Sequence, residues 1–137
     1  MGRVFFNTRV NIDTTSCTGT DTYVMKASDS GKTFLVSGGA QAITLLPAAD
    51  LIEGWNCRFI TTASPSGDKT INAASTIIVG ASANSAGTGA SSDGTAKTTC
   101  IIEAASQAGN KVEIICDGSL YHVSGTQGQN AATTFGA

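Results

Sequence analysis

The sequence has few charged residues and few aromatic residues. Charged residues make up 13% of the 137 residues, about half of the usual share, and Phe, Trp and Tyr together make up 6%. The formal net charge is −2 and no segment gathers Lys and Arg into a cluster, so the footprint of a nucleic-acid-binding protein is missing. No apolar run reaches the length of a membrane span. We therefore expect neither nucleic acid nor membrane as a partner.

The residue types that build catalytic and metal sites are also scarce. His122 is the only histidine, and a nucleophilic triad needs a base beside its nucleophile. The carboxylates are scattered, and no Cys-x-x-Cys pair of the kind usual in zinc sites occurs. The sequence thus predicts no catalytic residue, no metal site, no cofactor and no enzymatic activity. The N-terminal residues hold Arg3 but neither a long apolar core nor a cleavage pattern, so we expect no signal peptide and synthesis in the cytoplasm.

The four cysteines point to the protein interior. Cys57, Cys100 and Cys116 alternate with apolar neighbours in predicted strands, and Cys17 lies in a predicted loop. Cysteine is among the most often buried residue types, so we expect small buried thiols. An even number of cysteines also allows disulfides, and a bridge between two of them in the core is the alternative.

Strand and turn signals, by contrast, are frequent. Residues 4–12 alternate apolar and polar side chains, which predicts a long first strand. Two runs around Gly38-Gly39 predict a hairpin, and Pro47 ends the second run because proline cannot donate to a ladder. Further strands are expected at 21–26, 32–37, 41–46, 55–62, 70–72, 76–79 and 98–104. With no sustained helical periodicity, this pattern predicts one all-β domain over residues 1–137, an antiparallel sandwich or barrel-like fold.

The clearest hairpin signal is Asp117-Gly118 between two β-prone runs. Such a dipeptide is typical of a type I′ turn, which needs positive φ at both central residues. This turn predicts three cross-strand pairs on one mostly apolar face: Cys116 with Ser119, Ile114 with Tyr121, and Val112 with Val123. His122 would then lie opposite Glu113 on the other face, where a structural pair is expected rather than a catalytic one.

Trp55 is the single tryptophan, and two interpretations of it are open. Its alternation with Cys57 and Phe59 predicts that it packs in the core. The nearby Arg58 allows the alternative of a platform for a sugar ring.

Three segments do not fit a compact sandwich. Residues 80–96 contain only small side chains and one Asp, and residues 126–137 are similar apart from Phe135. We expect a long loop and a C-terminal tail there, and an N-terminal strand or arm at residues 1–12. These segments are expected to become ordered against a partner, with a flexible linker as the alternative. The interface residues predicted on them are Phe5, Phe6, Arg9 and Phe135.

Four short motifs follow one another between residues 28 and 125. They are Ser30-Gly31-Lys32, then Thr44-Leu45-Leu46-Pro47-Ala48, then Gly54-Trp55-Asn56-Cys57-Arg58-Phe59, then Asp117-Gly118-Ser119-Leu120-Tyr121-His122-Val123. In this order the chain resembles the capsid decoration (cement) proteins of tailed bacteriophages, which have related modules in tail fibres. It departs from that family in its second Leu before Pro47 and in its four cysteines.

The resemblance implies a virion structural protein without an active site. Such a protein would be made in the host cytoplasm, form a homotrimer, and bind the major capsid protein on the outer surface of the capsid. The alternative that the resemblance leaves open is a tail-fibre or receptor-binding β module that recognises host surface glycan. The small number of aromatic residues, most of them inward by alternation, argues against this alternative.

Overall fold

The computed structural model describes residues 10–75, 77–84, 90–127 and 133–136. In these ranges the chain forms eleven strands and two short 3-10 helices. The elements are β1 (Asn11–Asp13), β2 (Tyr23–Val24), η1 (Ala27–Asp29), β3 (Lys32–Val36), β4 (Gln41–Thr44), η2 (Ala48–Asp50), β5 (Asn56–Thr61), β6 (Lys69–Asn72), β7 (Ile78–Asn84), β8 (Thr99–Ile102), β9 (Lys111–Cys116), β10 (Tyr121–Gln127) and β11 (Thr133–Gly136).

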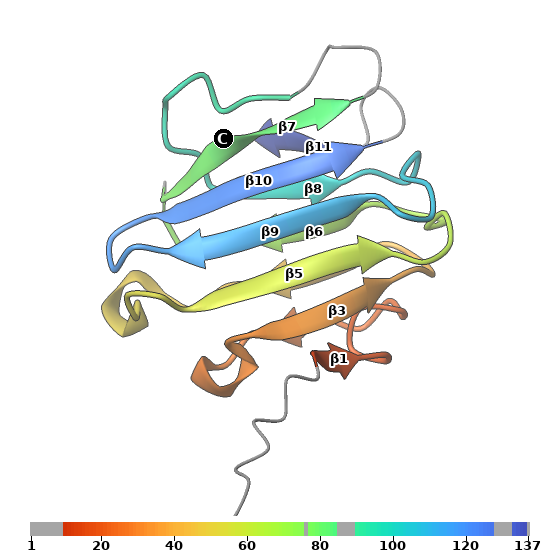
Figure 1. The fold of residues 1–137 in the computed structure, drawn as a ribbon, viewed down its shortest axis with the longest axis horizontal. Coiled ribbons are helices and arrows are strands. Elements are labelled where there is room, and N and C mark those ends of the chain that lie inside the picture. The colour runs from red at the N-terminus through yellow and green to blue at the C-terminus, as the bar shows by residue number, and fades with distance from the viewer. Residues whose placement is uncertain (1–9, 76, 85–89, 128–132, 137) are drawn as a thin grey trace, which may run out of the picture.

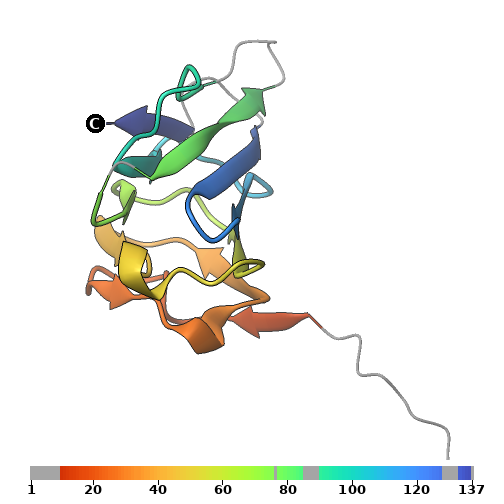
Figure 2. The same cartoon turned by 90° about the vertical axis from the view of Figure 1, so that its left-hand side faces the viewer.

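The strands form two mixed sheets that pack face to face, which confirms the expected all-β sandwich. Sheet A has the order β1-β3-β5-β9-β10-β7 and faces the viewer in Figure 1. Sheet B, behind it, has the order β11-β8-β6-β4-β2. Figure 2 shows the same body from the side, with the first strands at the bottom and β7 and β11 at the top.

The first six strands wind as a coil. Successive strands alternate between sheet A and sheet B, and within each sheet they pair in parallel. The corners of successive turns stack through backbone hydrogen bonds: Ser37 N–H donates to the Cys17 carbonyl, and Ser66 N–H donates to the Gly38 carbonyl. The prediction of an antiparallel hairpin at Gly38-Gly39 is therefore wrong, because this corner passes the chain to the other sheet. Alternation of side chains is the same in both arrangements, so the sequence pattern does not distinguish them.

The rest of the chain adds mainly antiparallel strands to the coil. In sheet A, β9 lies antiparallel to β5 and β10 lies antiparallel to β9, while β7 pairs in parallel with β10. In sheet B, β8 lies antiparallel to β6, and β11 lies antiparallel to β8. The expectation of antiparallel pairing thus holds for β8, β9, β10 and β11, apart from the parallel pair of β7 with β10, and is wrong for the coil.

The core between the sheets is built by the inward positions of these strands. Phe34 and Phe59 stack with ring centroids 5.5 Å apart. Trp55 is 1% exposed, meets Tyr121 edge-on at 6.0 Å, and donates its ring N–H to the Lys26 carbonyl at 3.2 Å. The prediction that Trp55 packs in the core is confirmed, and the sugar platform is excluded. The four cysteines are all buried and free, which confirms the interpretation as small buried thiols and not the one with a disulfide bridge.

The last hairpin keeps the predicted faces but not the predicted turn. Cys116 pairs with Tyr121, and only Gly118, with φ of 92°, has a left-handed conformation in the turn. Positive φ at the first central residue is the geometry of a type II′ turn centred on Gly118-Ser119. The Asp117 carboxylate selects it by accepting bonds from the N–H groups of Ser119 and Leu120 at 2.8 and 2.7 Å. The register moves by two residues, so the predicted inward side chains remain inward except Ser119, which is exposed in the turn.

The predicted loop at 80–96 begins as a strand instead. β7 continues to Asn84 because Gly80 lies so close to β10 that an added Cβ would sit 2.0 Å from the Val123 carbonyl oxygen. The predicted tail likewise contains the end of β10 and, in β11, a strand that pairs with β8. Small side chains allow strands to pair closely. A prediction that relies on β-branched and aromatic residues therefore misses strands of this kind. Of the predicted first strand, the structure has Asn11–Asp13, and residues 1–9 lie outside the described part.

Candidate functional site

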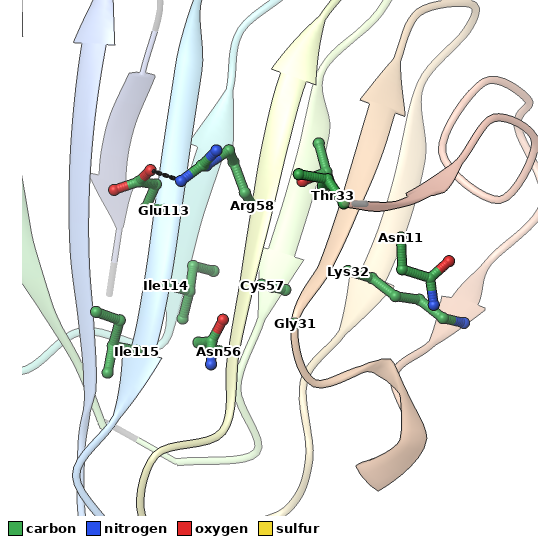
Figure 3. A pocket seen from close by; sticks show the side chains of 11 residues that line it. Asn11, Gly31, Lys32, Thr33, Asn56, Cys57, Arg58, Glu113, Ile114 and Ile115 are labelled. Atoms are coloured by element: carbon green, nitrogen blue, oxygen red, sulfur yellow. Dashed lines mark ion pairs between the residues drawn. The ribbon is translucent and has the colours of Figure 1, made fainter. Parts of the chain in front are cut away.

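A shallow groove of about 500 Å³ crosses the outer face of sheet A near β1 (Figure 3). It is lined by Val10, Asn11, Gly31, Lys32, Thr33, Asn56, Cys57, Arg58, Glu113, Ile114 and Ile115. These residues come from the starts of β3 and β5, the end of β9 and the first residues of the described chain. The groove therefore runs across the strands and not along them.

An ion pair forms one wall of the groove. Thr33, Arg58 and Glu113 lie in register on β3, β5 and β9, and their side chains share the outer face. The Arg58 guanidinium donates to Glu113 Oε1 at 2.6 Å, and the Lys111 ammonium lies 3.8 Å from the same oxygen. Both partners are partly exposed, so the pair contributes at most about 1 kcal/mol to stability. The pair places charged and hydrogen-bonding groups along this wall of the groove.

The floor of the groove is open because Gly31 has no side chain there. Gly31 adopts φ of 79°, and no atom lies within 4 Å of the place where a Cβ would be. Its N–H donates to the Asn56 carbonyl at 2.7 Å, which fixes this corner of the coil to β5. The Asn56 side chain in turn donates to the Gly54 carbonyl at 3.0 Å. A positive φ favours glycine, so the same residue makes the turn and the opening.

Apolar side chains stand at both ends of the groove. Val10 is 56% exposed at the β1 end, and Ile115 is 55% exposed at the β9 end. Ile12, on β1, is 53% exposed beside the groove. A polar centre between two apolar ends is suited to an extended peptide, whose backbone and side chains need both kinds of contact.

Lys32 borders the groove but is held by a structural ion pair. Its ammonium lies 2.6 Å from Oδ1 of the buried Asp29, which also accepts bonds from Tyr23 OH and Lys26 N–H. Burial opposes ionisation of Asp29, but these hydrogen bonds outweigh it and lower its pKa. The same contact raises the pKa of Lys32. Both groups are thus charged at neutral pH and serve the turn at η1.

His122 does not lie where the sequence placed it. It is opposite Ile115, and Glu113 is opposite Ser124. The His122 imidazole Nε2 lies 2.6 Å from Asp117 Oδ2, and this hydrogen bond is the main cause that lowers the Asp117 pKa to about 2. The pair is exposed at the end of the hairpin and closes the turn. His122 therefore has the predicted structural role, but its partner is Asp117 and not the predicted Glu113.

Lys69 is a buried cation that the sequence pattern did not single out. It is 0% exposed, and its Nζ donates to the Gly19 carbonyl at 2.7 Å and to Gln41 Oε1 at 3.2 Å. Gln41 in turn donates to the carbonyls of Ser16 and Asp21 at 2.7 and 2.6 Å. Burial lowers the Lys69 pKa. The alternation of Lys69 with Ile71 is the signal that could have placed it inward.

The predicted interface residues lie in different parts of the chain. Phe5, Phe6 and Arg9 are outside the described residues. Phe135 is on β11, the edge strand of sheet B, where it packs half-buried against the core opposite Cys100. That edge is at the far side of the body from β1.

The described residues offer neither a metal site nor a membrane-spanning helix. No group of three or more His, Cys, Asp and Glu residues there is placed to hold a metal ion. Within the same ranges, no helix has the length and apolar character to cross a bilayer.

Comparison of the chain with family models, with curated proteins and with solved structures finds no match in any of the three. A proposal for its function therefore rests on the groove, on the sheet edges and on the motifs of the sequence.

Proposed function

We propose that this protein is a capsid decoration protein, a virion structural protein that binds the outer surface of a phage capsid, stabilises it and self-associates as a homotrimer. The observation that carries the proposal is the apolar surface of the first turn of the coil. Val10, Ile12 and Val24 are each more than half exposed there. Val10 and Ile12 lie at the β1 edge of sheet A, and Val24 lies on β2, at the corresponding edge of sheet B. Apolar side chains exposed at a sheet edge favour contact with another protein.

The same region contains the edges of both sheets. In the described part of the chain, β1 pairs only with β3, and β2 pairs only with β4. An edge strand presents unpaired N–H and C=O groups that can accept a strand from a neighbouring chain. Apolar contact and strand addition are the two interactions by which a small β protein can attach firmly to a shell without an active site.

The motif order supports the choice of a decoration protein among structural proteins. Each motif has a definite task in this fold. Gly31 makes the corner before β3, Pro47 follows the last strand residues of the second turn, and Gly118 makes the turn of the last hairpin. The resemblance to phage decoration proteins therefore involves the residues that build the body.

The alternative is a tail-fibre or receptor-binding module for host glycan. Asn56, Arg58 and Glu113 offer polar groups that could bind sugar hydroxyls. Trp55, the residue best suited to stack on a sugar ring, is in the core. The large hydrophobic side chains that are exposed in the described part are all aliphatic. This composition favours a protein partner.

Co-sedimentation with capsid shells tests the proposal. Shells of the phage that encodes the protein, prepared without it, are mixed with the purified protein and pelleted. We expect saturable binding at hundreds of copies per shell, and weaker binding for Ile12→Ser than for the control Ile52→Ser, which changes an exposed residue beyond η2. Binding to host glycan with no binding to shells would establish the alternative. A clean monomer by light scattering at micromolar concentration would contradict the trimer.

A further inference from the structure

Charge is divided unevenly along the chain. Residues 1–9 contain Arg3 and Arg9 and no acidic residue. The rest of the chain has six Lys and Arg residues against ten Asp and Glu residues, a net charge of −4. A cationic segment is therefore attached to an anionic body, and opposite net charges favour the approach of two copies. The groove itself is not anionic, because Lys32 and Arg58 line it together with Glu113, its one acidic side chain.

The size and chemistry of the groove suit the apolar part of that segment. From β1 to β9 the groove crosses three strand spacings, which is about 14 Å at roughly 4.8 Å each. An extended chain covers that distance in about four residues. The segment has the run Val4-Phe5-Phe6, and exposed Val10 and Ile115 stand at the two ends of the groove. Aromatic side chains between two apolar ends are typical anchors of such contacts.

The place where the segment joins the body indicates which copy it reaches. Val10 lines the groove, and β1 starts at the next residue. The residues from Phe5 to Val10 include neither Gly nor Pro, and the alternation of residues 4–12 predicts that the strand continues before β1. Nine residues in that predicted conformation would span about 30 Å, a length sufficient to reach a neighbouring body.

We propose that the groove on sheet A binds the N-terminal segment of a second copy of this chain. Phe5 and Phe6 of one copy pack between Val10 and Ile115 of the other, and an arginine of the segment approaches Glu113. This arm exchange gives a specific contact for the self-association that belongs to the proposed function. It does not require the capsid.

Mixed disulfide formation between engineered cysteines tests the arm exchange. Phe6→Cys and Ile115→Cys are made in separate full-length chains, one with a short tag, then mixed and oxidised mildly. The native thiols are buried and free, and even Cys57, which lines the groove, is only 3% exposed, so they compete little with the engineered thiols. We expect a tagged–untagged disulfide dimer at several-fold higher yield than from Phe6→Cys mixed with the control Gln107→Cys, an exposed position outside the groove.

The other outcomes overturn the proposal. A double Phe6→Cys/Ile115→Cys chain that closes an internal disulfide, while the mixed chains give no more dimer than the control, would show that the segment binds its own groove. Control-level yield in both experiments would show that the groove does not take the segment. Capsid co-sedimentation is independent of these yields, so the failure of arm exchange and the failure of the decoration function are distinguishable.

Discussion

Replacing Gly80 by Ala probes the close approach of β7 to β10. The added methyl carbon would lie 2.0 Å from the Val123 carbonyl oxygen, against the more than 3.0 Å that such contacts need. Both atoms belong to paired backbones, so neither side can relieve the contact by rotating a side chain. The two strands must separate by about 1 Å around Gly80.

The cost follows from the ladder between the two strands. β7 and β10 pair over seven positions, and an added 1 Å stretches a hydrogen bond of ordinary length beyond its useful range. Loss of three or four such bonds costs roughly 3 kcal/mol at about 1 kcal/mol each. Replacing glycine by alanine also raises the free energy of unfolding by about 0.4–1 kcal/mol, because it restricts the unfolded chain. We therefore expect a net destabilisation of about 2–3 kcal/mol, or a fall of about 1–2 M in the urea midpoint.

Urea unfolding followed by the fluorescence of Trp55 measures this difference, since Trp55 is the only tryptophan and lies in the core. Gly19→Ala is the matched control, because its added Cβ would meet nothing nearer than Asp21 N at 4.0 Å. The control should stay within about 1 kcal/mol of the wild type, on the stabilising side. Equal midpoints for the two alanine variants would refute the close approach of β7 to β10.

Three further changes test the core, the hairpin and the buried cation. Trp55→Ala should cost about 3–5 kcal/mol by calorimetry, since it removes a buried ring and its bond to Lys26, and a small change in melting temperature would contradict that packing. Gly118→Val should cost on the order of 1 kcal/mol or more, because φ there is 92°; an unchanged melting temperature would show a different turn. Burial lowers the Lys69 pKa below its unfolded value of about 10.5, so unfolding takes up a proton and stability rises as pH approaches that value. The rise lies between the folded and the unfolded pKa, so urea midpoints at pH 7 and at about pH 10.5 should show it in the wild type relative to Lys69→Met, and parallel midpoints would rule it out.

The faces of most strands could be predicted from the sequence, but the connections between them could not. In the last hairpin the inward residues are the predicted ones apart from Ser119, because alternation fixes the faces of the strands even where the turn is misjudged. The corner at Gly38 has the sequence of a hairpin turn, and its passage to the other sheet depends on bonds to corners that are distant in sequence. Gly80 and the small residues after it form a strand only because β10 lies beside them.

In the candidate site, too, local features could be predicted from the sequence, whereas contacts between strands could not. Arg58 and Glu113 each lie on a predicted strand, yet their contact depends on the pairing of β5 with β9. The opening at Gly31 is local turn chemistry, which the sequence does reveal. The burial of Lys69 was not predicted, because the predicted strand begins one residue later, at Thr70, and so omits the alternation of Lys69 with Ile71.

The coil also sets the order in which this chain can fold. β5 and β6 finish the coil, but the strands that pair with their open edges, β9 and β8, are synthesised later. Since these pairings join distant parts of the chain, loop closure makes folding slow, in the range of milliseconds to seconds. During synthesis the coil therefore leaves the ribosome with two unpaired, half-apolar strand edges. A chaperone that shields those edges until β9 emerges should raise the yield of folded protein more than one that acts after synthesis is complete.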